Sequence, residues 1–365
     1  MLISFYSCIE PIKIENIAFE DRIVIKSIIT NEFKNHIVNI SKTIRIDSSN
    51  IVPVNNALVL ITDNNNVIHP FKDKGNGIYE SINKFKAEPS KSYTLEVQTS
   101  KGKKYISSAE ELPSTSEIKD IYVNVEKKEL EKPKAIIKVN SIGRSNTKGK
   151  FYRYEYEETY KVQTAVWSNK KIIVISDQSP YEFDLISKSD EDGIGFCYGT
   201  NKSKNIILTE TKSLSENKVI GFPVRSIPID NHYIGIRYSI LLKQYVINNN
   251  SYDYYDLLNK FSDPDNIFSQ VQVGEIPSNI SSSTGEKVIG FFEVSSISSK
   301  RVFFNREEVT PISEYINYGN TSAKTCANTI IYPKVENSFG ESPMLNSLEN
   351  YIFAKLPENP NPPKN

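Results

Sequence analysis

Short runs of alternating apolar and polar residues dominate the first third of the chain. In one run, Tyr93, Leu95 and Val97 fall on one side and Thr94 and Glu96 on the other, which is the pattern of a half-buried strand. Runs of this length separated by turn residues favour an antiparallel β-sandwich. Strands are predicted at Arg22–Thr30, His36–Ile46, Ala57–Thr62, Ile78–Phe85, Tyr93–Gln98 and Tyr105–Ser107.

The breaks between these runs carry strong turn signals. Asn and Asp cluster at Asp63–Asn66, and glycine flanks Asn76 at Lys74–Gly77, where left-handed backbone is readily adopted. The run Ala57–Ile61 is apolar at every position, which predicts a central strand buried on both faces. We therefore expect a first domain at residues 21–113, and we take the polar, proline-broken stretch Glu110–Ser116 as the linker.

A second, larger β-rich domain is predicted at residues 117–335. Tyr152–Val166 alternates over a long stretch, Ile234–Leu242 repeats the pattern, and Lys287–Phe304 supplies two more apolar segments. One helix is expected, with Ser251 as its cap, Asp263 and Pro264 at its end, and one apolar face. That face comprises Tyr254, Leu257, Leu258 and Phe261. Residues 336–365 end in a proline-rich stretch and are expected to be irregular and partly disordered.

The long strand at Tyr152 presents an aromatic side and a charged side. Its tyrosines are Tyr152, Tyr154, Tyr156 and Tyr160. Such a row can stack against a sugar or pack between two sheets. Core packing is the favoured interpretation, because the chain has only one tryptophan.

Composition and charge narrow the class of protein. The chain has 365 residues, with 21 Tyr and 17 Phe but only 15 Gly, and residues that pack well on a pleated surface favour a mainly β protein. The 44 basic residues equal the 44 acidic ones, so no charge excess favours nucleic acid as a partner. The sequence contains no apolar run of 18 residues, so no transmembrane helix is predicted.

The first residues indicate a lipid anchor. Apolar residues at the start run into Ser7 and Cys8, as in a bacterial lipoprotein signal, where a small residue precedes the cysteine that receives the lipid. Phe5 and the absence of a basic segment depart from that pattern. We interpret residues 1–20 as a signal remnant and tether, with Cys8 as the lipidation site; the alternative is a cytosolic β-protein with an apolar start.

If Cys8 is lipidated, the other two cysteines, Cys197 and Cys326, make an even pair in an oxidising envelope, where a disulfide can persist. They are either bridged or two unrelated thiols. A bridge would close a loop of about 130 residues and fix the C-terminal segment to the sheet.

The sequence carries none of the common motifs of catalytic or nucleotide-binding chemistry. The chain has no phosphate loop, no G-x-S-x-G elbow and no H-E-x-x-H helix. Its three histidines stand far apart, so a zinc site is not predicted. We therefore expect a non-enzymatic protein without a cofactor, with no catalytic and no metal-binding residues.

Four stretches together resemble the Bacteroidota envelope lipoproteins catalogued as domain of unknown function 4249. They extend over roughly residues 8 to 330, and their order and spacing carry the likeness. The stretches are Ser7–Pro11; Val54–Asp63 with Gly77–Tyr79 and Tyr93–Leu95; Tyr238–Tyr245 with Tyr252–Tyr255; and Val288–Val294 with Lys300–Phe304.

The resemblance implies an N-terminal immunoglobulin-like domain of the carboxypeptidase-regulatory kind, followed by the larger β-rich domain with one short helix. It also implies an outer-membrane location and an accessory role beside a TonB-dependent outer-membrane receptor. No catalytic residues carry over. The leading expectation is thus a lipid-anchored envelope protein that partners this receptor. The rival is a self-standing surface module that binds glycans or peptides.

Overall fold

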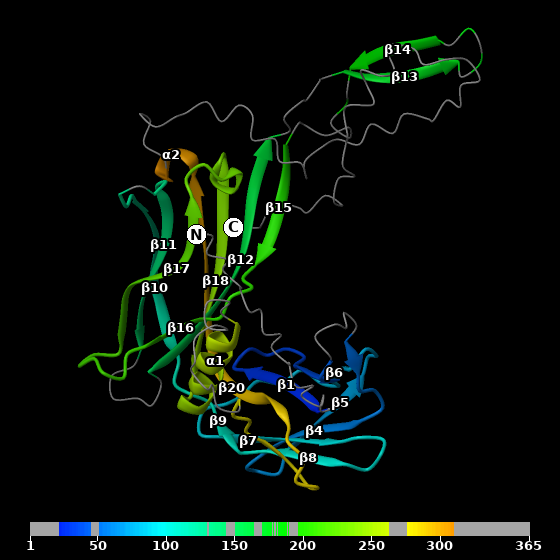
Figure 1. The fold of residues 1–365 in the computed structure, drawn as a ribbon, viewed down its shortest axis with the longest axis vertical. Coiled ribbons are helices and arrows are strands. Elements are labelled where there is room, and N and C mark those ends of the chain that lie inside the picture. The colour runs from blue at the N-terminus through cyan, green and yellow to red at the C-terminus, as the bar shows by residue number, and fades with distance from the viewer. Residues whose placement is uncertain are drawn as a thin grey trace, which may run out of the picture. The chain divides into compact units, whose positions relative to one another are not determined.

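The protein is mainly β, as the sequence predicts (Figure 1). The computed structural model describes residues 22–44, 51–129, 131–143, 150–163, 170–176, 178, 180, 182–187, 189, 196–262 and 276–309. These residues form two compact units. The immunoglobulin-like topology of the N-terminal domain stays a prediction.

The first unit is built from two separate pieces of the chain. It extends to Glu111 and also takes in Gly274–Val294, whereas the second unit comprises Leu112–Val273 and the chain from Ser295 onward. The sequence places the later piece in the second domain. The structure places it in the first unit, because β19 (Ile280–Ser282) pairs with β8 (Lys104–Ser107) and β20 (Ile289–Asn305) pairs with β1 (Ile23–Thr30).

The sheet of the first unit follows the order β20-β1-β2-β6-β5-β4-β7-β8-β19, with β3 paired to β2 and β9 to β7. Only the first six residues of β20, Ile289–Val294, belong to this unit, and the strand from Ser296 onward pairs with β18 in the second unit. The remaining strands are β2 (Ile37–Lys42), β3 (Val52–Pro53), β4 (Leu58–Asp63), β5 (Ile68–Asp73), β6 (Ile78–Ser81), β7 (Ser92–Gln98) and β9 (Glu110–Glu111).

Alternation places one side of these strands in a core. Tyr93, Leu95 and Val97 are buried, as predicted, and Val59 and Ile61 of β4 pack on the same side. The turn after β4 is held by Asp63, whose Oδ1 accepts hydrogen bonds from the backbone N–H groups of Asn65 and Val67, both at 2.9 Å. Lys91 pairs with the other oxygen at 3.0 Å.

Two glycines in the turn between β5 and β6 differ in what surrounds them. Gly75 and Gly77 both have positive φ, but a Cβ on Gly77 would lie 2.1 Å from the Ile40 carbonyl oxygen, whereas a Cβ on Gly75 meets nothing within 4 Å. We expect Gly75→Ala to lower the free energy of unfolding by about 1 kcal/mol, the cost of left-handed backbone. Gly77→Ala should cost about 2–3 kcal/mol, because β2 must also move. Urea unfolding of both variants tests this, and equal costs would contradict it.

The second unit is a sandwich of two sheets with a separate hairpin. One sheet has the order β10-β11-β17, and the other has the order β15-β12-β18-β20, with β16 also paired to β12. Among the strands that the structure describes, β13 (Lys170–Ser176) and β14 (Glu182–Ser187) pair only with each other. The sandwich strands are β10 (Ser116–Glu126), β11 (Lys134–Gly143), β12 (Phe151–Gln163), β15 (Phe196–Lys202), β16 (Ile207–Glu210), β17 (Lys218–Pro228) and β18 (Arg237–Ile247).

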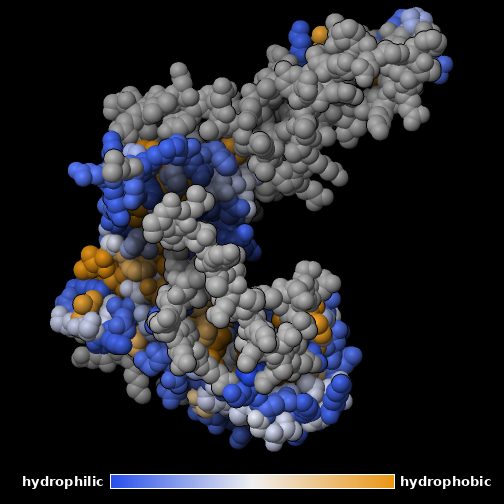
Figure 2. All heavy atoms as spheres, in the orientation of Figure 1, coloured by the Kyte–Doolittle hydropathy of each residue, from blue (hydrophilic) through white to orange (hydrophobic). Residues whose placement is uncertain are grey.

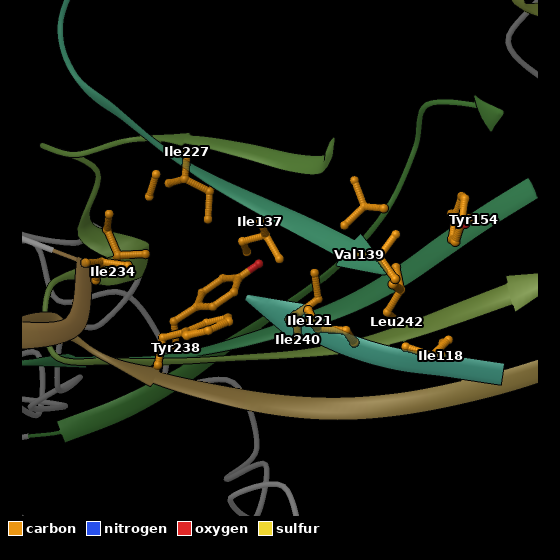
Figure 3. Close-up of a cluster of buried hydrophobic side chains, with 14 of the residues drawn as sticks. Ile118, Ile121, Ile137, Val139, Tyr154, Ile227, Ile234, Tyr238, Ile240 and Leu242 are labelled. Carbon is orange, nitrogen blue, oxygen red and sulfur yellow. The ribbon is translucent and has the colours of Figure 1, made fainter. Parts of the chain in front are cut away.

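The core of the second unit lies between these two sheets. In Figure 3, Ile137 and Val139 of β11 and Ile240 and Leu242 of β18 lie within one cluster of buried side chains. The predicted tyrosine side of β12 faces this core, since Tyr152, Tyr154 and Tyr160 are buried in the same cluster. This placement overturns the sugar-platform alternative, because rings packed between two sheets have no face left for a ligand.

The predicted helix is present but begins earlier than expected. Helix α1 spans Asn249–Ser262, and the side chain of Asn248, not Ser251, caps it by accepting a hydrogen bond from the Ser251 N–H at 2.8 Å. Ser251 is inside the helix and fully buried, and Phe261 is exposed. The buried face is therefore shifted toward the start of the helix. A short second helix, α2, follows β20 at Arg306–Val309.

Candidate functional site

A buried carboxylate stands at the centre of the second unit. Glu158 lies among the inward-facing tyrosines of β12 and is 2% exposed. Arg225 reaches it from β17 in the opposite sheet, with Nε 2.9 Å from Oε2 and Nη2 3.0 Å from Oε1. Tyr238 of β18 donates a third hydrogen bond to Oε2 at 2.6 Å. These three hydrogen bonds satisfy the carboxylate. Because Arg225 and Glu158 lie in opposite sheets, their ion pair links the two sheets.

Aromatic rings enclose this ion pair. The guanidinium of Arg225 lies 5.5 Å from the centre of the Tyr156 ring, and Tyr160 stacks on Tyr233 at 4.0 Å. Burial, with the nearby Glu158 charge, raises the pKa of Tyr238 well above its ordinary value. Burial, with the Tyr233 phenol, raises the pKa of Tyr160 to about 12. Both phenols therefore stay protonated near neutral pH. Tyr238 acts as a hydrogen-bond donor to Glu158, and the Tyr160 hydroxyl accepts a hydrogen bond from the Asn201 side chain.

A second buried cation lies near the other end of β12. The guanidinium of Arg153 sits between the rings of Tyr245 and Tyr255, 4.2 Å and 4.8 Å from their centres. Arg153 also bonds to Glu155, which accepts a hydrogen bond from the Tyr245 hydroxyl at 3.1 Å. Since Tyr255 belongs to α1, this stack fixes the helix to the sheet.

The feature best suited to binding a partner lies on the outer side of the first unit. Six aliphatic residues there are between 39% (Ile78) and 58% (Ile82) exposed. Alternation and register place them on one side of the sheet, opposite the core residues. We call this set the aliphatic face: Ile37, Leu58, Ile68, Ile78, Ile82 and Ile106.

The aliphatic face also corrects a prediction about β4. The run Ala57–Ile61 was expected to be buried on both sides, but Leu58 is 54% exposed while Val59 and Ile61 are fully buried. Figure 2 shows hydrophobic residues at the surface where β5 and β6 lie. An outward-facing sheet side is ordinarily polar, so exposed aliphatic residues on several adjacent strands favour a contact surface.

Of the three cysteines with a predicted role, only Cys197 is among the residues that the structure describes. Cys8 and Cys326 lie outside the described residues, and Cys197 is in β15, where its backbone pairs with Val162 of β12. Lipidation and the disulfide therefore stay predictions. Among the residues that the structure describes, no cluster of three or more His, Cys, Asp or Glu could hold a metal ion. In the same part of the chain, no helix has the length and apolar character needed to cross a membrane.

Sequence reasoning missed both the ion pair and the aliphatic face. One signal was visible for the pair, since Glu158 is a lone acid on the side of β12 that carries the tyrosines. Nothing in the sequence pointed to Arg225 as its partner. The aliphatic face is visible only once the register is known, because its residues come from separate strands.

The family comparison agrees with the resemblance seen in the sequence. Residues 9–301 match the family model described as Domain of unknown function (DUF4249), which is well over half of the chain. The chain belongs to the DUF4249 family. No curated protein matches this DUF4249 chain.

Solved structures that match this DUF4249 protein do so at low sequence identity and low TM-score. A DUF4785 family protein from Legionella pneumophila is 12% identical with a TM-score of 0.18, and the match covers 61% of this chain and 51% of that one. Trypsin-activated alpha-2-macroglobulin from Escherichia coli is 8% identical, also with a TM-score of 0.18, and the match covers 63% of this chain and 15% of that one. A Salmonella alpha-2-macroglobulin mutant is 7% identical, again with a TM-score of 0.18. That match covers 80% of this chain and 15% of the macroglobulin. The chain thus spans about half of the Legionella protein and a small part of each macroglobulin.

Proposed function

We propose that this DUF4249 protein is a lipid-anchored, non-enzymatic component of the bacterial envelope that binds a TonB-dependent outer-membrane receptor. The observation that carries the proposal is the aliphatic face of the first unit. Its six residues lie on five strands, β2, β4, β5, β6 and β8, with Ile82 directly after β6. Burying exposed aliphatic side chains against a partner is favourable by about 25 cal/mol per Å² of apolar surface.

The N-terminus supports a location at the outer membrane. Cys8 follows a small residue after an apolar start, and lipid at this position would hold the chain at the membrane surface. The segment between Cys8 and Ile23 can span at most about 50 Å, even fully extended. The first unit would therefore stay close to the membrane, where the barrel of a receptor is found.

The test is affinity purification of the full chain from native membranes, with a variant of the aliphatic face. Leu58→Lys with Ile68→Lys places two charges on that face at positions more than half exposed, so the fold should tolerate them. We expect wild type to recover an outer-membrane barrel in near-stoichiometric amount and the variant to recover at least fivefold less. The matched control is Leu214→Lys with Ile220→Lys, at exposed aliphatic residues of the second unit; it should behave as wild type.

Two results would contradict the proposal. One is that wild type recovers no outer-membrane barrel. The other is that the Leu58 and Ile68 variant recovers as much barrel as the control, since the aliphatic face would then not be the contact surface.

A further inference from the structure

One part of the first unit combines exposed apolar side chains with lysines. The turn between β1 and β2 carries Phe33, which is 69% exposed, and the segment after β6 carries Ile82, which is 58% exposed. Three exposed lysines belong to the same two segments. We call this set the Phe33 tip: Phe33, Ile82, Lys34, Lys84 and Lys86.

Backbone hydrogen bonds hold the two segments of the Phe33 tip side by side. The Lys34 N–H donates to the Phe85 carbonyl oxygen at 3.3 Å, and the Phe85 N–H donates to the Lys34 carbonyl oxygen at 3.1 Å. On the other side of the turn, the Ala87 N–H donates to the Thr30 carbonyl oxygen at 2.8 Å. The side chains of the two segments are therefore presented together by the fold.

The turn itself keeps Phe33 at the surface. On one side of Phe33, the Glu32 N–H donates to the Thr30 hydroxyl at 3.4 Å. On the other side, the Asn35 side-chain amide donates to the Ser81 carbonyl oxygen at 2.6 Å. These contacts fix the backbone around Phe33 while its ring stays in water. A phenylalanine ring so exposed gains free energy when a partner removes it from water.

The Phe33 tip has a positive charge that neighbouring acids do not cancel. Lys34 forms an ion pair with Glu32, whereas Lys84 and Lys86 form no ion pair within the part of the chain that the structure describes. The next acid along the chain, Glu88, pairs with a different lysine at 2.8 Å. Two lysine charges therefore stand beside the exposed apolar side chains.

This combination favours a membrane over a protein partner. Protein interfaces are depleted in lysine. A bilayer accepts both kinds of side chain, because aromatic and aliphatic groups enter the edge of the acyl layer while lysine ammonium groups stay among anionic headgroups. Lys84 and Lys86 flank the buried Phe85, so alternation along the chain directs both lysines away from the core and toward such a surface.

We propose that the Phe33 tip binds an anionic lipid bilayer, with Phe33 and Ile82 at the edge of the acyl layer and the lysines among the headgroups. A soluble polyanion fits less well, because it would contact the lysines and leave the Phe33 ring in water. The proposal needs no lipid at Cys8. Apart from Ile82, the residues of the tip lie outside the aliphatic face, so this proposal can fail while the receptor proposal holds.

The test measures binding of the purified full chain to lipid vesicles. The parent chain carries Cys8→Ser, so that no lipid attached to the protein can cause the binding. Co-sedimentation compares vesicles made of equal parts phosphatidylglycerol and phosphatidylcholine with vesicles of phosphatidylcholine alone. Single-stranded DNA serves as the soluble polyanion.

Two variants of the Phe33 tip separate its apolar and its charged parts. Phe33→Ser removes the exposed ring, and Lys84→Gln with Lys86→Gln removes the two lysine charges. Both variants leave Ile82 unchanged. The matched controls are at an exposed phenylalanine of the second unit and at two exposed lysines of the first unit: Phe261→Ser, and Lys101→Gln with Lys104→Gln.

We expect the parent chain to bind the anionic vesicles, more weakly as salt is added, and not to bind the neutral vesicles. Each tip variant should bind at least fivefold more weakly, because one part of the contact is lost, and each control should stay within twofold of the parent. Thermal unfolding verifies that every variant is folded. Phe33→Trp gives a second readout, since anionic vesicles should shift its fluorescence to shorter wavelength relative to the parent, whose single tryptophan is Trp167.

Four results would overturn the proposal. The first is that the parent chain does not bind anionic vesicles. The second is that the controls lose as much binding as the tip variants. The third is that single-stranded DNA is bound as tightly as the anionic vesicles, which would mean that charge is recognised without a bilayer. The fourth is that vesicles leave the fluorescence of Phe33→Trp unchanged from that of the parent.

Discussion

Replacing Arg225 with methionine should lower the free energy of unfolding of the second unit by about 3–5 kcal/mol, because it leaves the buried Glu158 carboxylate without its cation. Arg225 supplies two of the three hydrogen bonds that the carboxylate accepts, and Glu158 has no access to water that could replace them. Tyr238 alone would then have to satisfy the charge. Urea unfolding at neutral pH measures the loss.

Two further variants separate the ion pair from ordinary packing. Combining Arg225→Met with Glu158→Gln removes the buried charge, so the double variant should recover most of the loss. Lys119→Met breaks an ion pair with Glu117 in which both side chains are about half exposed or more, and it should cost no more than about 1 kcal/mol. If the single and double variants at Arg225 and Glu158 were equally unstable, the uncompensated charge would not be the cause.

Acid should destabilise the first unit through His36. This imidazole is 1% exposed, its Nε2 lies 3.0 Å from the Phe85 carbonyl oxygen, and its ring contacts the edge of Phe85. Burial, together with the positive charge of Lys34, lowers the pKa of His36 to about 4. The unfolded chain, with a pKa near 6.5, therefore binds the proton first as the pH falls. Stability is fully present above about pH 6.5 and is lost down to about pH 4, by about 3 kcal/mol in all.

The measurement is hydrogen exchange of core amides of β4, such as Ile61, as a function of pH, because it reports on the first unit separately. His36→Gln should flatten the slope between pH 6.5 and 4, even if it lowers stability overall. His232→Gln is the matched control, since His232 lies in the second unit and should leave that slope unchanged. The prediction is wrong if His36→Gln keeps the slope of wild type.

Local alternation predicted the regular strands, in which the side of the sheet that a residue faces follows from its position in the apolar–polar pattern. Tyr93, Leu95 and Val97 face the core as their spacing indicates, and so do the tyrosines of β12. Alternation fails where a strand bulges. In β10 the register shifts between Ile118 and Asp120, so Ile118 and Ile121 are both buried although they are three positions apart, an offset that in a regular strand puts side chains on opposite sides. Because this bulge breaks the alternation, β10 was not predicted from the sequence.

The contacts that could not be predicted from the sequence are those that depend on long-range strand pairing. Arg225 faces Glu158 because it pairs with Ile137 beside a bulge in β17, and no local pattern encodes that alignment. Residues 276–294 join the first unit through pairing with strands near the start of the chain. The aliphatic face has the same origin, since its six side chains become neighbours only after five strands are aligned.

The membership of the start of β20 in the first unit has a consequence for synthesis on the ribosome. β1 is synthesised long before its neighbour β20, which begins only at Ile289, after most of the second unit has been made. A Cβ at Gly290 would lie 1.9 Å from the Ile25 carbonyl oxygen, which shows how closely the two strands approach in the finished fold. Until β20 arrives, β1 has an unpaired edge that can pair with other chains. The first unit is therefore begun first and completed late, and a nascent chain stalled before Ile289 should depend on chaperones to remain soluble.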